Sequence, residues 1–353
     1  MSGKNTKTPP VLYAILAAVC YGVSAPASKL LLGKLPPLLM AAVLYLGAGA
    51  GLFTVNLFRR GRGSEAGVTK QELPYVVAMV ALDIAAPILL MLGLTRTTSA
   101  TASLLNNFEI VATAVIAAAL FGEAVGRRMW LAVALITAGG GLLTVEDLGG
   151  LSFSYGSVLV LLACVCWGLE NNCTARLSAK DPLQIVVIKG FGSGLGALLI
   201  AAFAGSLSAA PIYIAAALLL GFVAYGLSIY FYILSQRHLG AARTSAFYAF
   251  APFIGVGLSL AIFRQTPAPA FFAALGLMLL GAYFAAFEEH SHAHLHVAVT
   301  HEHRHNHADP HHDHIHQPPV AGGHSHRHTH GPLEHSHTHA PDLHHTHSHE
   351  RPL

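Results

Sequence analysis

Ten apolar stretches constrain the fold of this chain more than any other feature. Each is near the ~20 residues that an α-helix needs to cross the hydrocarbon of a bilayer. They lie at about 11–32, 37–58, 73–95, 98–121, 127–145, 155–176, 183–205, 211–235, 241–263 and 268–287. Charged residues make up only 10% of the chain, whereas a soluble domain carries about 25%. We therefore predict an all-α membrane protein with ten transmembrane helices, joined by short connections.

The first stretch has a second interpretation. It follows Lys4 and Lys7 and contains a run of small residues at 24–27, a pattern that also occurs in cleaved signal peptides. Its apolar region is long for a signal peptide, and cleavage would leave nine spans. We expect an uncleaved first helix.

Lysine and arginine are unevenly distributed between the ends of the predicted spans. With the N-terminus in the cytoplasm, twelve basic residues fall on cytoplasmic segments and four on outer ends. Cytoplasmic loops usually carry such an excess, so the sequence predicts a multi-pass protein of the cell (plasma) membrane with both termini in the cytoplasm. The net charge of +3 comes from scattered basic residues, and no nucleic-acid partner is expected.

The second half of the chain repeats the first. At an offset of 146 residues, Ala17, Val19, Cys20, Tyr21 and Gly22 correspond to Ala163, Val165, Cys166, Trp167 and Gly168. At an offset of 142 residues, Ala100, Ser103, Phe108, Phe121, Ala132, Leu135 and Gly139 correspond to Ala242, Ser245, Phe250, Phe263, Ala274, Leu277 and Gly281. Each repeat holds five spans, an odd number, so the second repeat enters the membrane from the opposite side. After a cytoplasmic N-terminus at 1–10, residues 11–145 and 146–287 are predicted to form two inverted five-helix repeats. A solute site is then expected near the midplane where the repeats meet.

These features carry a resemblance to a known family. Both halves open with Ala-x-x-Cys-aromatic-Gly, at 17–22 and 163–168, and Phe-Gly-Glu at 121–123 precedes a glycine-rich fifth helix. With five plus five spans, the pattern resembles the drug/metabolite transporter superfamily, specifically its ten-helix proteins built from two EamA domains, over residues 11–287. The resemblance implies secondary transport of small organic molecules, such as amino acids or other metabolites, without an ATP site. The second half departs from it, because Phe-Arg-Gln at 263–265 lacks the acidic residue.

Four ionisable residues fall well inside the spans: Asp83, Glu109, Glu170 and Lys189. Each costs about 2.5 kcal/mol or more at the centre of a bilayer, so such side chains usually face a bundle interior or a cavity. Glu170 and Lys189 lie at matching depth on consecutive helices, which favours a structural ion pair. Asp83 and Glu109 lie near the midplane. For Glu109, a substrate or proton site and a hydrogen bond between helices are equally good interpretations, whereas Asp83 favours the hydrogen bond.

Other polar residues share helix faces with these positions, or lie on facing helices, in a pattern that suits an amphipathic organic ligand. The candidate substrate or proton path comprises Asp83, Ser103, Asn106, Glu109, Asn171, Tyr225, Ser228 and Tyr248. Hydrogen bonds between helices are the alternative explanation. No span contains HExxH, and the chain has no GxSxG or Walker A sequence, so we do not expect an enzyme.

The tail at residues 288–353 has a different composition. Of the 24 histidines, 23 lie after residue 289, interleaved with small and polar residues, and few large apolar residues accompany them. Such a segment is predicted to be disordered. Neutral imidazole binds Zn, Ni, Co and Cu, so the tail is predicted to bind transition-metal ions, while the body requires no cofactor. The candidate metal ligands are His301, His303, His305, His307, His311, His312, His314, His316, His324, His326, His328 and His330.

The sequence thus favours a transporter that exports an amino-acid-like or drug-like solute by alternating access, with a tail that regulates transport or buffers metal. Its expected partners are the solute, the lipid bilayer and divalent metals at the tail. A homodimer stays an open alternative. Two further alternatives are a transition-metal exporter fed by the tail and a membrane-anchored metal store or sensor. The ten predicted spans contain no histidine, which disfavours a dedicated metal exporter.

Overall fold

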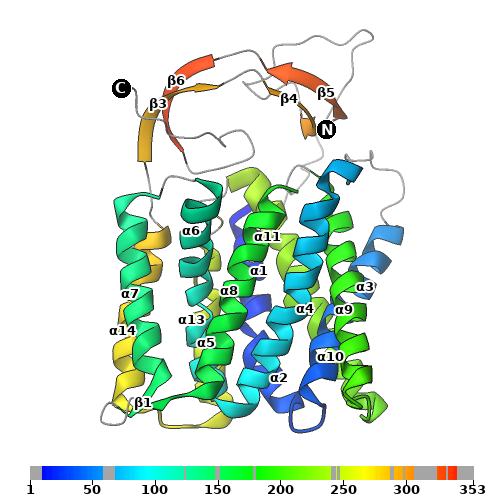
Figure 1. The fold of residues 1–353 in the computed structure, drawn as a ribbon, viewed down its shortest axis with the longest axis vertical. Coiled ribbons are helices and arrows are strands. Elements are labelled where there is room, and N and C mark those ends of the chain that lie inside the picture. Colours follow the sequence, from blue (N-terminus) through cyan, green and yellow to red (C-terminus); the bar gives the residue numbers. More distant parts are fainter. Residues whose placement is uncertain are drawn as a thin grey trace, which may run out of the picture.

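The computed structural model describes residues 10–58, 68–122, 125–147, 152–177, 180–239, 244, 247–286, 290–296, 299–305, 324–330 and 333–339. Most of these residues belong to long helices that run side by side between two ends of the molecule (Figure 1). The final strands lie beyond the end of the bundle at which the last helix finishes (Figure 1).

The first repeat contains α1 (Pro10–Gly22), α2 (Ser24–Leu31), α3 (Pro37–Phe58), η1 (Lys70–Glu72), α4 (Leu73–Arg96), α5 (Ser99–Leu105), α6 (Phe108–Phe121) and α7 (Arg127–Thr144). A short antiparallel pair, β1 (Val145–Asp147) and β2 (Ser152–Phe153), follows it. The second repeat contains α8 (Tyr155–Ala175), α9 (Pro182–Phe203), α10 (Pro211–Gly221), the π-helix η2 (Phe222–Leu227), α11 (Ser228–Leu239), α13 (Ala251–Phe263) and α14 (Pro269–Ala286).

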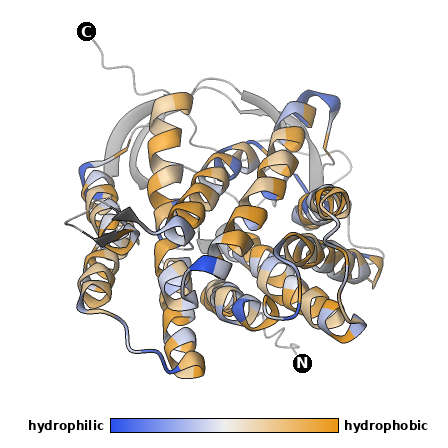
Figure 2. Cartoon of the chain, turned by 60° about the horizontal axis from the view of Figure 1, so that its bottom comes forward, coloured by the Kyte–Doolittle hydropathy of each residue, from blue (hydrophilic) through white to orange (hydrophobic). Residues whose placement is uncertain are grey.

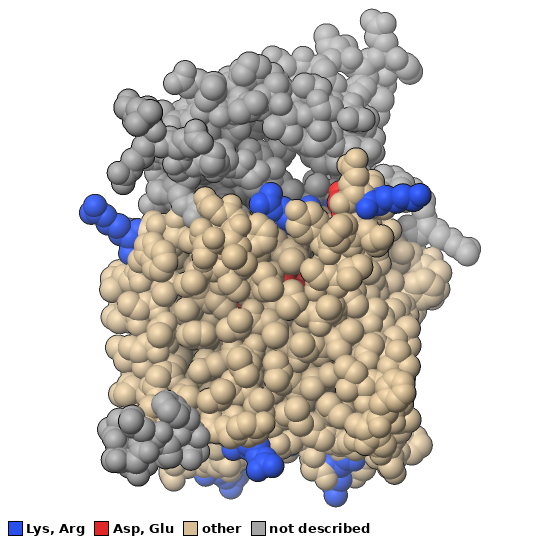
Figure 3. Space-filling model, in the orientation of Figure 1, with Lys and Arg blue, Asp and Glu red and all other residues tan. Residues whose placement is uncertain are grey.

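Helices occupy all ten predicted places among the described residues, and eight of the spans are long and apolar enough to cross a membrane. The other two are the fifth span, α7, which begins with Arg127 and Arg128, and the ninth, where α13 alone has 13 residues. Hydrophobic residues run along most of each helix (Figure 2), and lysine and arginine gather at the two ends of a broad band that shows very little charge (Figure 3). The predicted all-α membrane-spanning body is confirmed.

Three spans that were expected to be continuous are interrupted. The first breaks at Val23, because Pro26 has no N–H to donate to the carbonyl four residues earlier. The fourth breaks at Asn106 and Asn107, where the Asn107 side chain donates to the Leu104 carbonyl at 3.0 Å and so competes with the helical bond. A turn at residues 249–250 also interrupts the ninth span. Interrupted helices beside the midplane are where secondary transporters bind their solutes.

Helices α3 and α9 pack side by side with their backbones in near contact. A Cβ added at Gly190 would lie only 2.3 Å from the backbone nitrogen of Gly49, so glycine is required there. The packing on either side repeats: Gly47 and Gly51 face Leu218 and Phe222, as Gly192 and Gly196 face Val80 and Ile84. The two repeats therefore correspond in three dimensions at an offset of 145 residues between α3 and α9, and of 138 residues between α4 and α10.

Two antiparallel strand pairs lie in the described part of the tail. Strand β3 (His290–His296) pairs with β6 (Leu333–His339), and β4 (Val299–His305) pairs with β5 (His324–His330), both antiparallel. Histidine at every second residue matches the two-residue period of a strand. Of the candidate metal ligands, His307, His311, His312, His314 and His316 lie outside the described residues.

Candidate functional site

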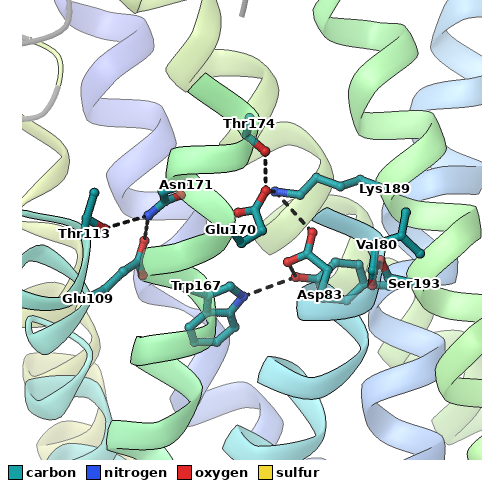
Figure 4. Close-up of polar contacts among 11 residues, drawn as sticks. Val80, Asp83, Glu109, Thr113, Trp167, Glu170, Asn171, Thr174, Lys189 and Ser193 are labelled. Carbon is teal, nitrogen blue, oxygen red and sulfur yellow. Dashed lines mark hydrogen bonds and ion pairs between the residues drawn. The ribbon is translucent and has the colours of Figure 1, made fainter. Parts of the chain in front are cut away.

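Three of the four predicted ionisable residues meet in one cluster between α4, α8 and α9, which we name the charge triad: Asp83, Glu170 and Lys189 (Figure 4). The Lys189 Nζ lies 2.9 Å from Glu170 Oε1 and 3.3 Å from Asp83 Oδ2. Both carboxylates are buried, at 0% and 1% exposure, and Thr174 donates a hydrogen bond to Glu170. Such a charge is tolerated in a dry interior only when a partner compensates it. Sequence reasoning paired Lys189 with Glu170 alone, and the structure adds Asp83.

Tyr45 donates a hydrogen bond to Asp83, and Trp167 in turn bonds to Tyr45. The Tyr45 hydroxyl donates to Asp83 Oδ1 at 2.9 Å, and the Trp167 indole N–H donates to the Tyr45 oxygen at 3.4 Å (Figure 4). A buried carboxylate with an ion pair and a hydrogen bond is the structural arrangement that the sequence favoured for Asp83. Tyr45 was not singled out from the sequence. Its only signal is a hydroxyl in the middle of an apolar span.

Glu109 lies apart from the charge triad, in the first turn of α6. The side chain of Asn171, from the second repeat, donates to Glu109 Oε1 at 2.8 Å and to Thr113 Oγ1 at 3.3 Å (Figure 4). Glu109 is partly buried and forms no ion pair among the described residues. The partial positive charge at the N-terminus of α6 favours a carboxylate at this position.

Five tyrosines form a row through the body, which we name the tyrosine row. Their ring centroids follow at 5.3 Å from Tyr45 to Tyr225, 6.1 Å to Tyr21, 5.7 Å to Tyr248 and 5.0 Å to Tyr232. The row draws on both repeats, since Tyr21 and Tyr45 belong to the first and the other three to the second. Tyr225 lies in the π-helix η2, a rare element that occurs frequently at functional sites.

Hydroxyl groups tie the tyrosine row to neighbouring helices. Ser24 donates to the Tyr225 oxygen at 3.1 Å, across the interface between the repeats. Ser228 donates to the carbonyl of Ala17 at 2.9 Å and also shares a hydrogen bond with Tyr248. Ser228 therefore holds α1 against α11, a contact between helices rather than an open path.

A small cavity lies beside Tyr21, between the first, fourth and ninth spans, with room for about one water molecule. The residues that line it are Tyr21, Gly22, Ala25, Ser103, Asn106, Ala251, Pro252 and Gly255. Ser103 is 2% exposed, and its hydroxyl has no hydrogen-bond partner among the described residues. The cavity lies where the three interrupted spans meet, so residues of both repeats line it. Its polar side chains, Tyr21, Ser103 and Asn106, all belong to the first repeat.

The predicted path residues therefore separate into groups. Ser103 and Asn106 line the cavity, and Glu109 and Asn171 bond to each other one turn further along. Tyr225 and Tyr248 join the tyrosine row, whereas Asp83 joins the charge triad. Tyr21 belongs to two of these groups, since it lines the cavity and lies in the tyrosine row. Sequence reasoning used it only as a repeat marker, although its place within the motif at 17–22 was a usable signal.

The sequence profile of the EamA-like transporter family matches residues 8–145 and 154–287, once for each five-span half. The chain belongs to the EamA-like transporter family. An uncharacterized transporter of Methanothermobacter thermautotrophicus is 26% identical to this EamA-like transporter over 268 residues, which span 71% of this chain and 78% of that protein. A crystal structure of another protein aligns with a TM-score of 0.57 at 19% identity and covers 79% of this chain and 96% of that one, so the two share a fold.

In this EamA-like transporter the charge triad breaks the internal symmetry. The repeat offsets of 146, 145 and 138 residues make Ser24, Leu44 and Gly221 the counterparts of Glu170, Lys189 and Asp83. All three counterparts are neutral. The two halves thus share a backbone plan but carry different charge at equivalent places.

Proposed function

We propose that this chain is a secondary transporter that exports a small organic solute, amino-acid-like or drug-like, by alternating access. The observation that carries the proposal is the hydrogen bond between Glu109 of the first repeat and Asn171 of the second, beside an interrupted helix. A partly buried carboxylate at the seam of two inverted repeats is well placed to sense a solute or a proton. The tyrosine row beside it offers apolar surface with hydroxyl groups, which suits an organic ligand.

The described state is closed at this point, since the cavity holds only about one water molecule. Solute binding in the proposed cycle requires the first span to move away from the fourth and ninth. The interrupted spans supply the joints for such a motion, because their backbones already leave the helical path at Asn106 and at residues 249–250.

We also propose that the tail binds Zn, Ni, Co or Cu and buffers the metal or regulates transport. The register of the two strands supports metal binding by the tail. His301, His303 and His305 of β4 lie opposite His328, His326 and His324 of β5. Alternation along a strand puts these six positions on one face. The body offers a contrast: among the residues whose side chains the structure describes, no three His, Cys, Asp or Glu side chains converge on a point that could hold a metal ion.

Transport by full-length and truncated protein in proteoliposomes tests both parts. We expect the full chain and a chain ending at residue 289 to move organic solutes from an amino-acid and amine panel equally well. Added Zn or Ni is expected to change transport by the full chain only, because the truncated chain lacks 23 histidines. Loss of Zn, Ni or Co transport on truncation would instead support the metal exporter. Metal binding without any transport would support a store or sensor.

The orientation is proposed from the basic residues. Both termini are expected in the cytoplasm, since the excess of lysine and arginine then faces inward. A reporter fused after residue 290 that is active only in the cytoplasm should be active, and one active only outside should be silent. A matched pair of fusions in the connection at 32–36 should give the reverse result. An external reporter signal at residue 290 would contradict both the orientation and the cytoplasmic tail.

A further inference from the structure

The charge balance of the interior is negative. Of the four ionisable side chains in the middle of the spans, three are acidic and one is basic. Lys189 is already engaged by two carboxylates, Asp83 and Glu170. Glu109 forms no ion pair with a cationic side chain among the described residues. A hydrogen bond from Asn171 holds its carboxylate in place. Burying a carboxylate without compensation is costly, so the site favours a positively charged occupant.

Tyrosine rings lie beside the part of the fourth span that leads to this carboxylate. Tyr21 lines the cavity together with Ser103 and Asn106, which precede Glu109 on the fourth span by six and three residues. Tyr21 contacts Tyr225 and Tyr248, with centroids at 6.1 and 5.7 Å. The face of an aromatic ring is negative and attracts ammonium groups, most strongly where water is excluded. A carboxylate beside several such rings recognises a cation that also has apolar surface.

An unsatisfied hydroxyl adds an independent sign of a ligand. Ser103 precedes Glu109 on the same span and lines the cavity next to Tyr21. Its oxygen is buried without a hydrogen-bond partner among the described residues. A buried polar atom without a partner is destabilising, and a serine hydroxyl accepts a hydrogen bond from an N–H group. A solute amine that binds between Tyr21 and the fourth span would have both Ser103 and Glu109 on the same span within reach.

We infer that the transported solute is an organic ammonium ion. It binds with its charged nitrogen against Glu109 and its apolar part against Tyr21 and Tyr248. This inference rests on the proposed transport function and narrows its solute to one charge class.

Three probes with one skeleton and different charge test the inference: tyramine, a cation; tyrosol, neutral; and 4-hydroxyphenylacetate, an anion. Binding to the purified full chain in lipid nanodiscs is measured by titration calorimetry. We expect tyramine to bind about tenfold more tightly than tyrosol, and the anion to bind weakest. Equal binding of tyramine and tyrosol by the full chain would overturn the inference.

Variants test which residues produce the preference for tyramine over tyrosol. Glu109→Gln should reduce the tyramine-to-tyrosol ratio to about unity, and Glu109→Asp should retain part of it. Tyr21→Phe keeps the ring and should keep the ratio, whereas Tyr21→Leu should lower it. The control is Glu72→Gln, since Glu72 is a carboxylate paired with Lys180 at 3.0 Å outside this site. Because the ratio compares two ligands on one variant, a lower yield of folded protein does not change it. An unaltered ratio in Glu109→Gln would also overturn the inference.

Exchange in proteoliposomes separates this inference from the transport function. If tyrosol or the anion moves and tyramine does not, transport stands and the cation site is wrong. If none of the amino acids, amines or three probes moves, the transport function itself is wrong.

Discussion

Replacement of Lys189 by methionine is expected to remove most of the folded protein. The change leaves the carboxylates of Asp83 and Glu170 buried without the ammonium that now lies 3.3 and 2.9 Å from them. Removing one partner of a buried ion pair costs about 3–5 kcal/mol. This is a large part of the ~5–15 kcal/mol that stabilises a typical folded protein. The yield of monodisperse protein in detergent and the free energy of unfolding measure the effect.

Companion variants separate charge from packing. The triple variant Asp83→Asn, Glu170→Gln, Lys189→Met should recover much of the loss, because no stranded charge remains. The double variant that keeps Asp83 should recover less. Lys70→Met is the control, since Lys70 is exposed. A normal yield from Lys189→Met, or no recovery in the triple variant, would contradict the role of the charge triad.

Gly190→Ala is also expected to destabilise the protein, in this case through a steric clash and without any change of charge. The new Cβ would lie 2.3 Å from the backbone nitrogen of Gly49 and 2.9 Å from the carbonyl of Tyr45. Backbone atoms of a central helix cannot move aside as a flexible side chain does. Overpacking of this kind costs about 1–3 kcal/mol, occasionally more. It would also displace Tyr45 and the neighbouring Lys189. Thermal unfolding in detergent should show a clearly lower midpoint.

The matched control for this change is Gly276→Ala in α14. A Cβ there meets no heavy atom within 4 Å. Glycine inside a helix costs about 0.5–1 kcal/mol relative to alanine, so this variant should be neutral or slightly more stable. Equal midpoints for the two variants would show that α3 and α9 are not as tightly apposed as the structure has them.

The span positions were predictable because the bilayer imposes a length and a composition on each helix. The interruptions were not predicted, although their residues are visible in the sequence. Pro26 breaks the first span through its missing N–H, and Asn107 breaks the fourth through a side-chain bond to the backbone. Hydropathy averages over a window and does not respond to such single-residue effects.

The site was predictable in part. Counting depth along helices placed Glu170 and Lys189 at one level, and the structure brings them together. The same counting put Asp83 nearer the midplane, but the long Lys189 side chain spans the difference. Tyr21 and Tyr45 were missed as site residues because an aromatic residue in an apolar span looks like ordinary packing. Which way its ring faces depends on helix contacts that one sequence does not reveal.

The neutral counterparts of the charge triad affect the equilibrium between the two conformations of the proposed transport cycle. In a carrier built from two identical inverted halves, the two halves can exchange conformations. The result is a second state, related to the first by symmetry and equal to it in free energy. Here the exchange moves three linked charges into surroundings that Ser24, Leu44 and Gly221 occupied. The inward-open and outward-open states of the proposed cycle then differ in free energy. Each 1.4 kcal/mol of difference changes the ratio of their populations about tenfold. In the proposed alternating-access cycle, the charge triad is therefore one difference between the halves that biases the carrier toward one conformation. A variant that removes all three charges together would shift this bias while leaving no stranded charge.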